Sequence, residues 1–213
     1  MTNQVAGTDT KSRIVEAARK LFWERGYGST GIAQILREAG ANAGSLYHFF
    51  PTKEELLLEV LESYKSMLGP EVMEPAFARA SDPVDRVFAV LHGYRAGLVA
   101  TGCAGGCPIG NLALEVSDSH PAARRKISEN FEAWCDAIRR CLDGASDRLP
   151  EGVDRTQLAS FVLTVMEGAV MQARAHRRVE PFDAAVAQLR DYLERLLSDG
   201  TSWAEPRGKR SPE

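Results

Sequence analysis

Residues 29–53 of the chain constrain its fold most, because two short helical patterns flank a tight turn there. Apolar side chains recur in the first pattern at i, i+3 and i+4, which is the spacing of one helix face. Ser29 or Thr30 can cap this helix through a hydroxyl, and Gly40 can take the left-handed conformation that ends it. Asn42 can cap the second helix. The pattern is typical of a helix-turn-helix, whose second helix enters the major groove of DNA.

The rest of the chain shows almost only helical periodicity, and it has no strand pattern, repeat or low-complexity tract. We expect a helix capped by Thr10 before the helix-turn-helix, and a long helix from near Lys53 to about residues 69–70. Further helices are expected at about residues 83–100, 108–116, 121–143, 154–177 and 181–198, with a weak helix or loop at 70–82. The predicted fold class is all-α, with an N-terminal three-helix helix-turn-helix domain (residues 1–53), a C-terminal helical ligand-binding and dimerisation domain (54–199) and a disordered tail (200–213).

Charge is distributed unevenly along the chain. The 213 residues carry 26 Lys or Arg and 29 Asp or Glu, which gives a net charge of −3 with histidine neutral. Residues 1–53 hold seven of these bases and four of the acids, whereas the remainder holds 19 and 25. A basic N-terminal unit on an acidic body fits a small phosphate-facing module joined to a part that does not touch DNA.

The sequence lacks the marks of an exported, membrane-bound or catalytic protein. It has no uncharged apolar run of roughly 18 residues and no basic-then-apolar signal pattern, so we expect a cytoplasmic protein without membrane contact. Its histidines have no cysteine or carboxylate partners at useful spacing: His48, His92, His120 and His176. We therefore expect no enzyme activity, no metal and no cofactor.

Several sequence blocks resemble one family. Three of them, between Lys11 and about Leu61, read I-V-E-A-A-R-K-L-F-W-E-R-G-Y, T-G-I-A-Q-I-L-R-E-A-G and G-S-L-Y-H-F-F-P-T-K-E-E-L-L. In order and spacing they are similar to the DNA-binding domain of TetR-type transcriptional regulators. The block G-C-P-I-G-N-L-A-L-E at residues 106–115 resembles the LmrA/YxaF-type branch of that family. The resemblance implies a homodimeric, ligand-responsive regulator, more often a repressor, that binds a double-stranded DNA operator.

Candidate DNA contacts lie in and around the helix-turn-helix. The resemblance assigns phosphate contacts to Tyr47 and Lys53, whose phenol and ammonium suit that role. Thr30, at a helix start, can offer a hydroxyl and backbone N–H groups to another phosphate. The residues able to reach base edges are on the outer face of the second helix: Asn42, Ala43, Gly44, Ser45 and His48. Lys11 and Arg13 can add contacts from the N-terminal arm.

An effector cavity is expected in the apolar, aromatic-rich C-terminal half. Its candidate lining residues are Phe88, Tyr94, Asn111, Glu115, Phe131, Trp134, Met166 and Gln172. Asn111 and Glu115 lie one helical turn apart in an otherwise apolar segment, where buried polar groups need partners. A ligand hydroxyl or amine could be that partner, and a structural hydrogen bond to a helix end is the alternative.

The cysteines allow a different signal. Cys107 precedes Pro108, which suits a first helical position, and a sulfur at a helix N-terminus favours the thiolate. A redox- or electrophile-sensing repressor that uses Cys107 and Cys103 is therefore the alternative to a ligand-responsive one. Cys135 and Cys141 look structural, because their spacing puts them on different faces of one helix.

The last two predicted helices are expected to form a four-helix interface between two protomers. Small residues in the first allow another helix to approach closely, and apolar residues in the second follow the seam spacing of packed helices. The candidates are Phe161, Val165, Gly168, Phe182, Val186, Leu189, Leu193 and Leu196. Effector binding would move the helix that begins near Lys53 and thereby change the distance between the two helix-turn-helix domains of the dimer. A helical protein-interaction module with a vestigial head remains the rival class.

Overall fold

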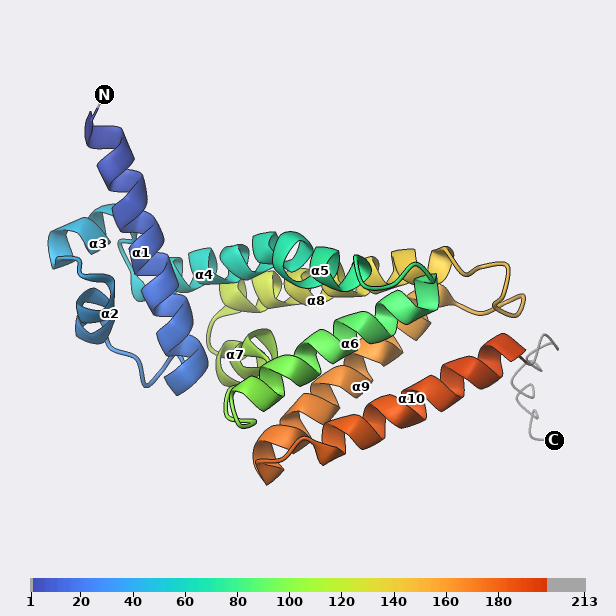
Figure 1. Cartoon of the computed structure of the whole chain (residues 1–213). Coiled ribbons are helices and arrows are strands. Elements are labelled where there is room, and N and C mark those ends of the chain that lie inside the picture. Colours follow the sequence, from blue (N-terminus) through green and yellow to red (C-terminus); the bar gives the residue numbers. More distant parts are fainter. Residues whose placement is uncertain (1, 199–213) are drawn as a thin grey trace, which may run out of the picture.

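The computed structural model describes the backbone of residues 2–198 and the side chains of residues 9–198. Within that range the chain is helical and contains no strand, which confirms the all-α prediction (Figure 1). The helices are α1 (Thr2–Arg25), α2 (Ile32–Ala39), α3 (Ala43–Phe49), α4 (Lys53–Met67), the π-helical η1 (Leu68–Met73), α5 (Glu74–Phe77), α6 (Pro83–Ala100), α7 (Pro108–Val116), α8 (Pro121–Asp143), α9 (Arg155–His176) and α10 (Glu180–Ser198). The tail predicted for residues 200–213 lies outside the described residues.

Helices α1, α2 and α3 form a small head at one end of the molecule (Figure 1). Their apolar faces meet in a core in which Ile14, Phe22, Ile35 and Leu46 are almost fully buried. Gly40 follows α2 with a φ of 56°, so the left-handed residue predicted to end this helix is confirmed. The head is therefore a helix-turn-helix supported by α1.

The starts of the two short helices differ from each other. Asn42 caps α3 as predicted, because its side chain accepts the Ser45 N–H at 2.8 Å. Gly31 precedes α2 instead of a hydroxyl residue, and its N–H donates to the Gln34 side chain at 2.8 Å. The predicted hydroxyl cap at position 29 or 30 was therefore wrong.

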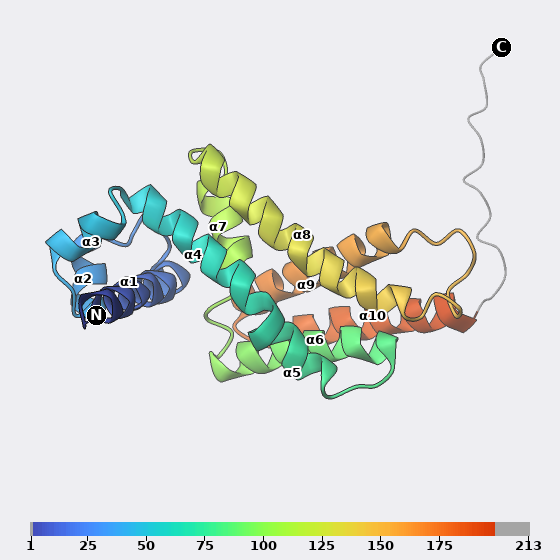
Figure 2. The same ribbon diagram turned by 90° about the horizontal axis from the view of Figure 1, so that it is seen from above.

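Helix α4 leads from the head into the body (Figure 2) and packs on both α1 and α8. It starts with a capping box, in which the Thr52 hydroxyl accepts the Glu55 N–H and the Glu55 carboxylate accepts the Thr52 N–H, both at 3.1 Å. The α-helix ends at Met67, earlier than predicted, and continues as η1. Pro70 explains the change, because it has no N–H to donate to the regular helical ladder.

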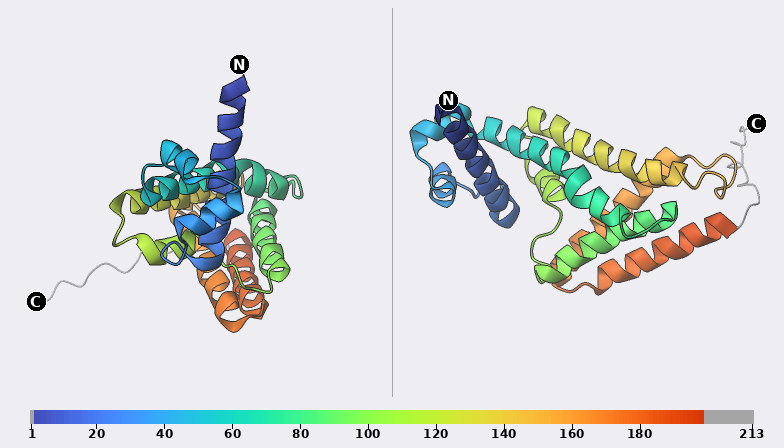
Figure 3. Two further views of the ribbon diagram at one scale, coloured as in Figure 1. Left: turned by 90° about the vertical axis from the view of Figure 1, so that its left-hand side faces the viewer. Right: turned by 45° about the horizontal axis from the view of Figure 1, so that its top comes forward.

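The body is a bundle of long helices (Figure 1, Figure 3). Helix α9 packs against α8 and α10, and α6 contacts all three. Helices α6 and α9 start at aspartate caps, where Asp82 accepts the Val84 N–H and Asp154 accepts the Thr156 N–H. The short α7 has the predicted bounds and packs on α8 and on α1 of the head. None of the helices within residues 2–198 combines the length and apolarity needed to cross a lipid bilayer.

The apolar face of α10 is buried within the chain, against α6 and α9. Its five members are at most 9% exposed: Phe182, Val186, Leu189, Leu193 and Leu196. Their assignment to a dimer interface was wrong, because the same spacing serves helix packing within one protomer. The α9 candidates Phe161, Val165 and Gly168 keep an exposed or partly exposed position.

Candidate nucleic-acid interface and effector cavity

Helix α3 lies on the head (Figure 1), and most of its residues and the residue before it are exposed. Most of the predicted DNA contacts lie there: Asn42, Ala43, Gly44, Tyr47 and His48 are exposed, and Ser45 is partly exposed. Tyr47, on the seven-residue helix α3, is 53% exposed, which is unusual for an aromatic side chain. Small neighbours around an exposed phenol leave the backbone of α3 open to a close approach by a partner.

Two polar groups of this region have partners inside the head. Asn42 Oδ1 accepts the Ser45 N–H, so the side-chain NH2 of Asn42 remains as a donor. Lys53 Nζ donates to the Tyr27 carbonyl at 2.6 Å and lies 4.1 Å from the centre of the Tyr27 ring. Burial lowers the pKa of Lys53, and the charge of Glu115 acts against that lowering. Lys53 is only partly exposed at the start of α4.

Thr30 does not suit the phosphate contact predicted for it. Its side chain is fully buried, and its hydroxyl donates to the Gly26 carbonyl at 2.7 Å and faces the Leu21 carbonyl at 3.3 Å. The prediction was wrong, because this hydroxyl fixes the loop between α1 and α2.

The predicted cations of the N-terminal arm are also used within the protein. Helix α1 begins well before Thr10, which lies inside the helix and does not cap it. Arg13 Nη1 donates to the Ala39 carbonyl at 2.9 Å, at the end of α2. Lys11 Nζ pairs with Glu59 of α4 at 2.6 Å. These contacts tie α1 to its neighbours, while the side chains of Lys11 and Arg13 remain 41% and 44% exposed, so their contact with DNA stays a prediction.

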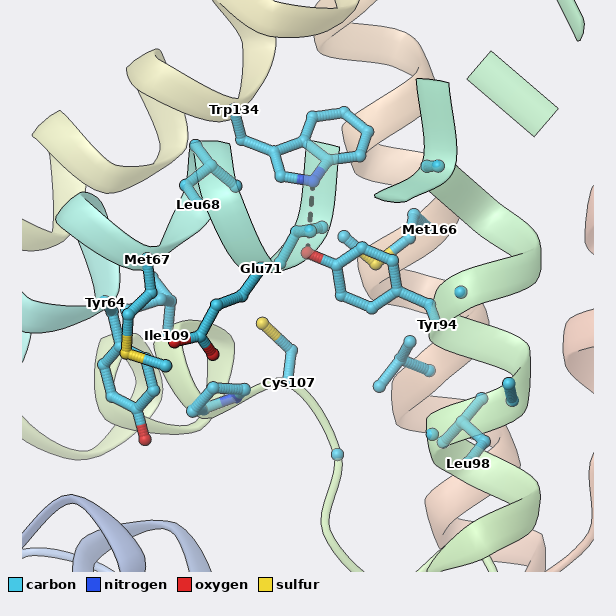
Figure 4. A pocket seen from close by; sticks show the side chains of 18 of the residues that line it. Tyr64, Met67, Leu68, Glu71, Tyr94, Leu98, Cys107, Ile109, Trp134 and Met166 are labelled. Carbon is cyan, nitrogen blue, oxygen red and sulfur yellow. Dashed lines mark hydrogen bonds between the residues drawn. The ribbon is translucent and has the colours of Figure 1, made fainter. Parts of the chain in front are cut away.

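A cavity of about 580 Å³ lies in the body, bordered by α4, η1, α6, α7, α8 and α9 (Figure 4). Four of the predicted lining residues border it: Tyr94, Phe131, Trp134 and Met166. Trp134 Nε1 donates to Tyr94 Oη at 3.1 Å, which joins two aromatic side chains in one wall. The size and the mostly apolar lining suit a small molecule with an aromatic or aliphatic body.

Two of the predicted lining residues lie away from this cavity. Phe88 belongs to the core, and the guanidinium of Arg190 lies 3.8 Å from the centre of its ring. Gln172 is exposed on α9. These predictions were wrong, because helical periodicity identifies an inward face but not whether that face borders a void.

Glu115, also predicted to contact a ligand, instead joins the body to the head. Its Oε2 accepts the Tyr27 N–H at 2.8 Å, and its Oε1 accepts the Gly28 N–H at 2.7 Å. Both N–H groups follow the last turn of α1. Trp23 Nε1, on that last turn, donates to the Gly106 carbonyl at 3.0 Å. We call these three hydrogen bonds the head–body clasp.

Asn111 has the structural role that was the alternative to ligand binding. Its Nδ2 donates to the Gly105 carbonyl at 2.9 Å, and its Oδ1 accepts Arg174 Nη1 at 2.7 Å. Asn111 thereby ties the segment before α7 to α9. The same segment lies tightly on α1, because a Cβ at Gly105 would overlap the Trp23 indole.

The cavity also has polar lining residues that the sequence did not point to, Glu71 and Glu167. Glu167 is the more informative, because its Oε1 atom is buried and has no hydrogen-bond partner among the described residues. The signal that could have found it is a single acid within the apolar run V-M-E-G-A-V of α9.

Cys107 borders the cavity close to Glu167. Burial, and after it the negative charge of Glu167, raises the pKa of the Cys107 thiol well above its ordinary value. The prediction that the N-terminus of α7 favours the thiolate was therefore wrong, since desolvation outweighs the nearby backbone amides. Cys103 is a buried thiol without a disulfide.

A helix-turn-helix on a helical body that contains a mainly apolar cavity defines a class of protein, the helix-turn-helix transcriptional regulators. Residues 14–60 match the bacterial regulatory proteins of the tetR family, and residues 83–189 match the tetracyclin repressor-like C-terminal domain. The chain belongs to the TetR family of transcriptional regulators.

The chain is similar to other bacterial regulators over most of its length. It is 29% identical to the regulator YxaF of Bacillus subtilis (strain 168) over 176 residues, which cover 81% of this chain and 89% of YxaF. It is also 29% identical to the regulator LmrA of the same strain over 191 residues, which cover 88% and 98%. A crystal structure of a TetR transcriptional regulator from Chloroflexus aurantiacus J-10-FL is 28% identical, with a TM-score of 0.77 and coverage of 89% of this chain and 96% of that chain. The LmrA/YxaF-like resemblance is thus confirmed.

Proposed function

We propose that this protein is a homodimeric repressor that binds a pseudo-palindromic operator through α3 and releases it when a small, mainly apolar molecule enters the cavity. The observation that carries the proposal is that Trp23 and Gly106 border the cavity and also form one hydrogen bond of the head–body clasp. A molecule in the cavity can therefore contact residues that hold the head. This activity on DNA would take place in the cytoplasm.

The contacts to DNA follow from the exposed surface of α3. The Tyr47 phenol is suited to a backbone phosphate, and the partly exposed Lys53 adds positive charge at the start of α4. The Asn42 amide, Ser45 and His48 supply hydrogen-bonding groups for base edges. The small residues Ala43 and Gly44 let the backbone of α3 approach the groove.

The dimer is assigned to the outer face of α9 and the adjoining face of α10. Phe161 is 45% exposed and Tyr192 is 38% exposed, and their rings meet edge to face with centroids 5.6 Å apart. Val165 and Gly168 lie on the same helix as Phe161 and are partly exposed. A two-fold axis through this surface would bury the aromatic pair of each protomer and place two heads on successive major grooves.

Release of DNA requires that the ligand favours a conformer that binds the operator poorly. Two routes lead from the cavity to the head. Tyr64, Met67 and Leu68 border the cavity at the end of α4, and α4 continues into the head. The second route passes through Gly106 and α7 to the head–body clasp. A ligand that displaces either wall tilts the head of each protomer.

Selection of binding sites from random duplex DNA by the purified protein tests this function. We expect enrichment of a pseudo-palindrome with half-sites about one helical turn apart. Tyr47→Phe should weaken binding to all enriched sequences alike, whereas His48→Ala should change the preferred bases. Failure to enrich any sequence, under conditions in which the protein is folded and dimeric, would contradict the proposal.

A further inference from the structure

One side chain that lines the cavity, Glu167, has a carboxylate oxygen without a hydrogen-bond partner among the described residues. Glu167 lies on α9 between the lining residues Met166 and Val170. Its Oε1 atom is buried without a hydrogen-bond partner among the described residues. Buried polar atoms in folded proteins are nearly always paired, and an unpaired carboxylate oxygen is costly. The unpaired atom therefore indicates a partner that comes from outside the chain.

The packing around Glu167 leaves room for its carboxylate. A Cβ at Gly110 of α7 would overlap Glu167 Oε2, so the glycine makes space for this group. The Cys107 thiol lies close to the same carboxylate, whose negative charge contributes to raising the pKa of that thiol. Helix α7 thus holds the carboxylate from one side, while Oε1 remains without a partner at the cavity.

The rest of the lining indicates the chemistry of that partner. Tyr64, Tyr94 and Trp134 provide aromatic surface, and the second acid, Glu71, points its carboxylate into the cavity (Figure 4). One cation, Arg79, is also part of the lining, and Arg79 and Glu71 are both exposed, which leaves Glu167 as the charged group in the less exposed part of the lining. Aromatic faces and carboxylates together favour an organic cation with an apolar body, and they disfavour an anion.

We propose that the effector is a protonated amine with an aromatic or aliphatic body, and that its ammonium group binds Glu167 Oε1. This assignment rests on the effector role proposed above for the cavity. A neutral donor would also give Oε1 a hydrogen bond, but only a cation compensates the buried negative charge as well. Burial raises the pKa of Glu167, and a bound ammonium would act against that rise.

Three ligands that share a naphthyl ring and differ in their polar group test the assignment: naphthylethylamine, naphthylethanol and naphthylacetate. Binding to the full chain without DNA is measured by calorimetry at pH 7.5. We expect the amine to bind about tenfold more tightly than the alcohol, since hydrogen bonds to charged groups are the stronger kind. The carboxylate ligand should bind most weakly.

Glu167→Gln keeps the shape of the side chain and removes its charge, so the affinities of amine and alcohol should converge to within about twofold. Glu151→Gln, at an exposed loop position between α8 and α9, is the matched control and should keep the preference. N-phenylnaphthylamine, a neutral fluorescent probe, should bind the parent and both variants equally, which reports an intact cavity.

Equal affinity for amine and alcohol in the parent, or a preference that persists in Glu167→Gln, would overturn the assignment of an amine. In both cases the neutral probe still binds, so the effector role of the cavity stands. If the neutral probe does not bind the parent, the effector role and the amine are both wrong. Operator selection, which needs no ligand, decides separately whether the protein binds DNA.

Discussion

Glu115, near the end of α7, and Glu167, on α9, use the same functional group in opposite ways. Glu115 is exposed, yet both of its oxygens accept backbone N–H groups of the head. Glu167 borders an apolar cavity, yet one of its oxygens has no partner in the described part of the chain. The partners of a carboxylate, and not its exposure alone, therefore separate a structural acid from a candidate binding acid.

Helix α7 connects the surroundings of the two glutamates. Gly110 in the first turn of α7 packs against the Glu167 carboxylate, Cys107 precedes that turn, and Glu115 lies further along the same helix. Helix α7 is short and also packs on α8, so we expect a movement imposed at its first turn to reach its last. The Glu167 contact and the Glu115 hydrogen bonds thus involve the first and the last turn of α7, and variants at the two glutamates should have different effects.

The largest loss of stability is expected from Gly105→Ala, which disturbs the packing of Trp23 in the head–body clasp. A Cβ at this position would overlap the Trp23 indole, so either the ring or the segment before α7 must move. Overpacking of this kind costs about 1–3 kcal/mol. Thermal unfolding followed by circular dichroism should show a lower Tm, and tryptophan fluorescence should shift toward the emission of exposed indole.

Gly97→Ala is the matched control for this substitution. Gly97 lies within α6, and a Cβ there would meet no atom within 4 Å. Alanine is a better helix former than glycine, so the control should be neutral or more stable by up to about 1 kcal/mol. A Gly105→Ala variant as stable as the parent would mean that Trp23 is not held at this position in solution.

Much of the fold follows from local sequence signals. The bounds of α7 could be predicted because Pro108 suits a first helical position and the helical pattern of apolar residues after it extends only to Val116. Asn42 and Gly40 act as a cap and a terminator through interactions within a few residues. Tyr94 and Trp134 are found in the cavity because helical periodicity directs large aromatic residues inward.

The errors concern contacts between residues that are distant in the chain. Glu115 accepts N–H groups from residues 87 and 88 positions away, and nothing in its neighbourhood marks those partners. Leu189 and Leu193 have a spacing that suits a partner helix, but the spacing does not say whether that helix belongs to the same chain. Thr30 has a type suited to phosphate contacts, but the fold turns its hydroxyl toward backbone carbonyls.

Glu115→Gln should give the next largest effect and test the head–body clasp from the α7 side. Glutamine has one acceptor oxygen, so its NH2 group would face either the Tyr27 or the Gly28 N–H, and one hydrogen bond is lost. We expect a loss of about 1 kcal/mol in stability. Hydrogen exchange should become faster at the amides of these two residues and remain unchanged in α8.

Asp118→Asn controls for the removal of a nearby charge, because Asp118 is exposed just after α7. It should leave the exchange rates at Tyr27 and Gly28 unchanged. Unchanged exchange at these amides in Glu115→Gln would show that the clasp does not protect them, and the comparison between the two acids would then fail.

Glu167→Gln should change stability least, and it should stabilise the protein, whereas Gly105→Ala and Glu115→Gln should destabilise it. Burial raises the pKa of Glu167 above its ordinary value of 4.5, so the folded state prefers the neutral side chain. Below pH 4.5 the carboxyl is protonated in both states, and parent and variant should be equally stable. As the pH rises, the carboxyl ionises first in the unfolded chain, so the parent loses stability relative to the glutamine variant, by up to about 1 kcal/mol near pH 8.

Thermal unfolding of both proteins between pH 4 and 8 measures this difference in stability. Saturating naphthylethylamine should reverse the difference by stabilising the parent more than the variant. A variant less stable than the parent at pH 8 without ligand would mean that the protein already satisfies Glu167, as it does Glu115.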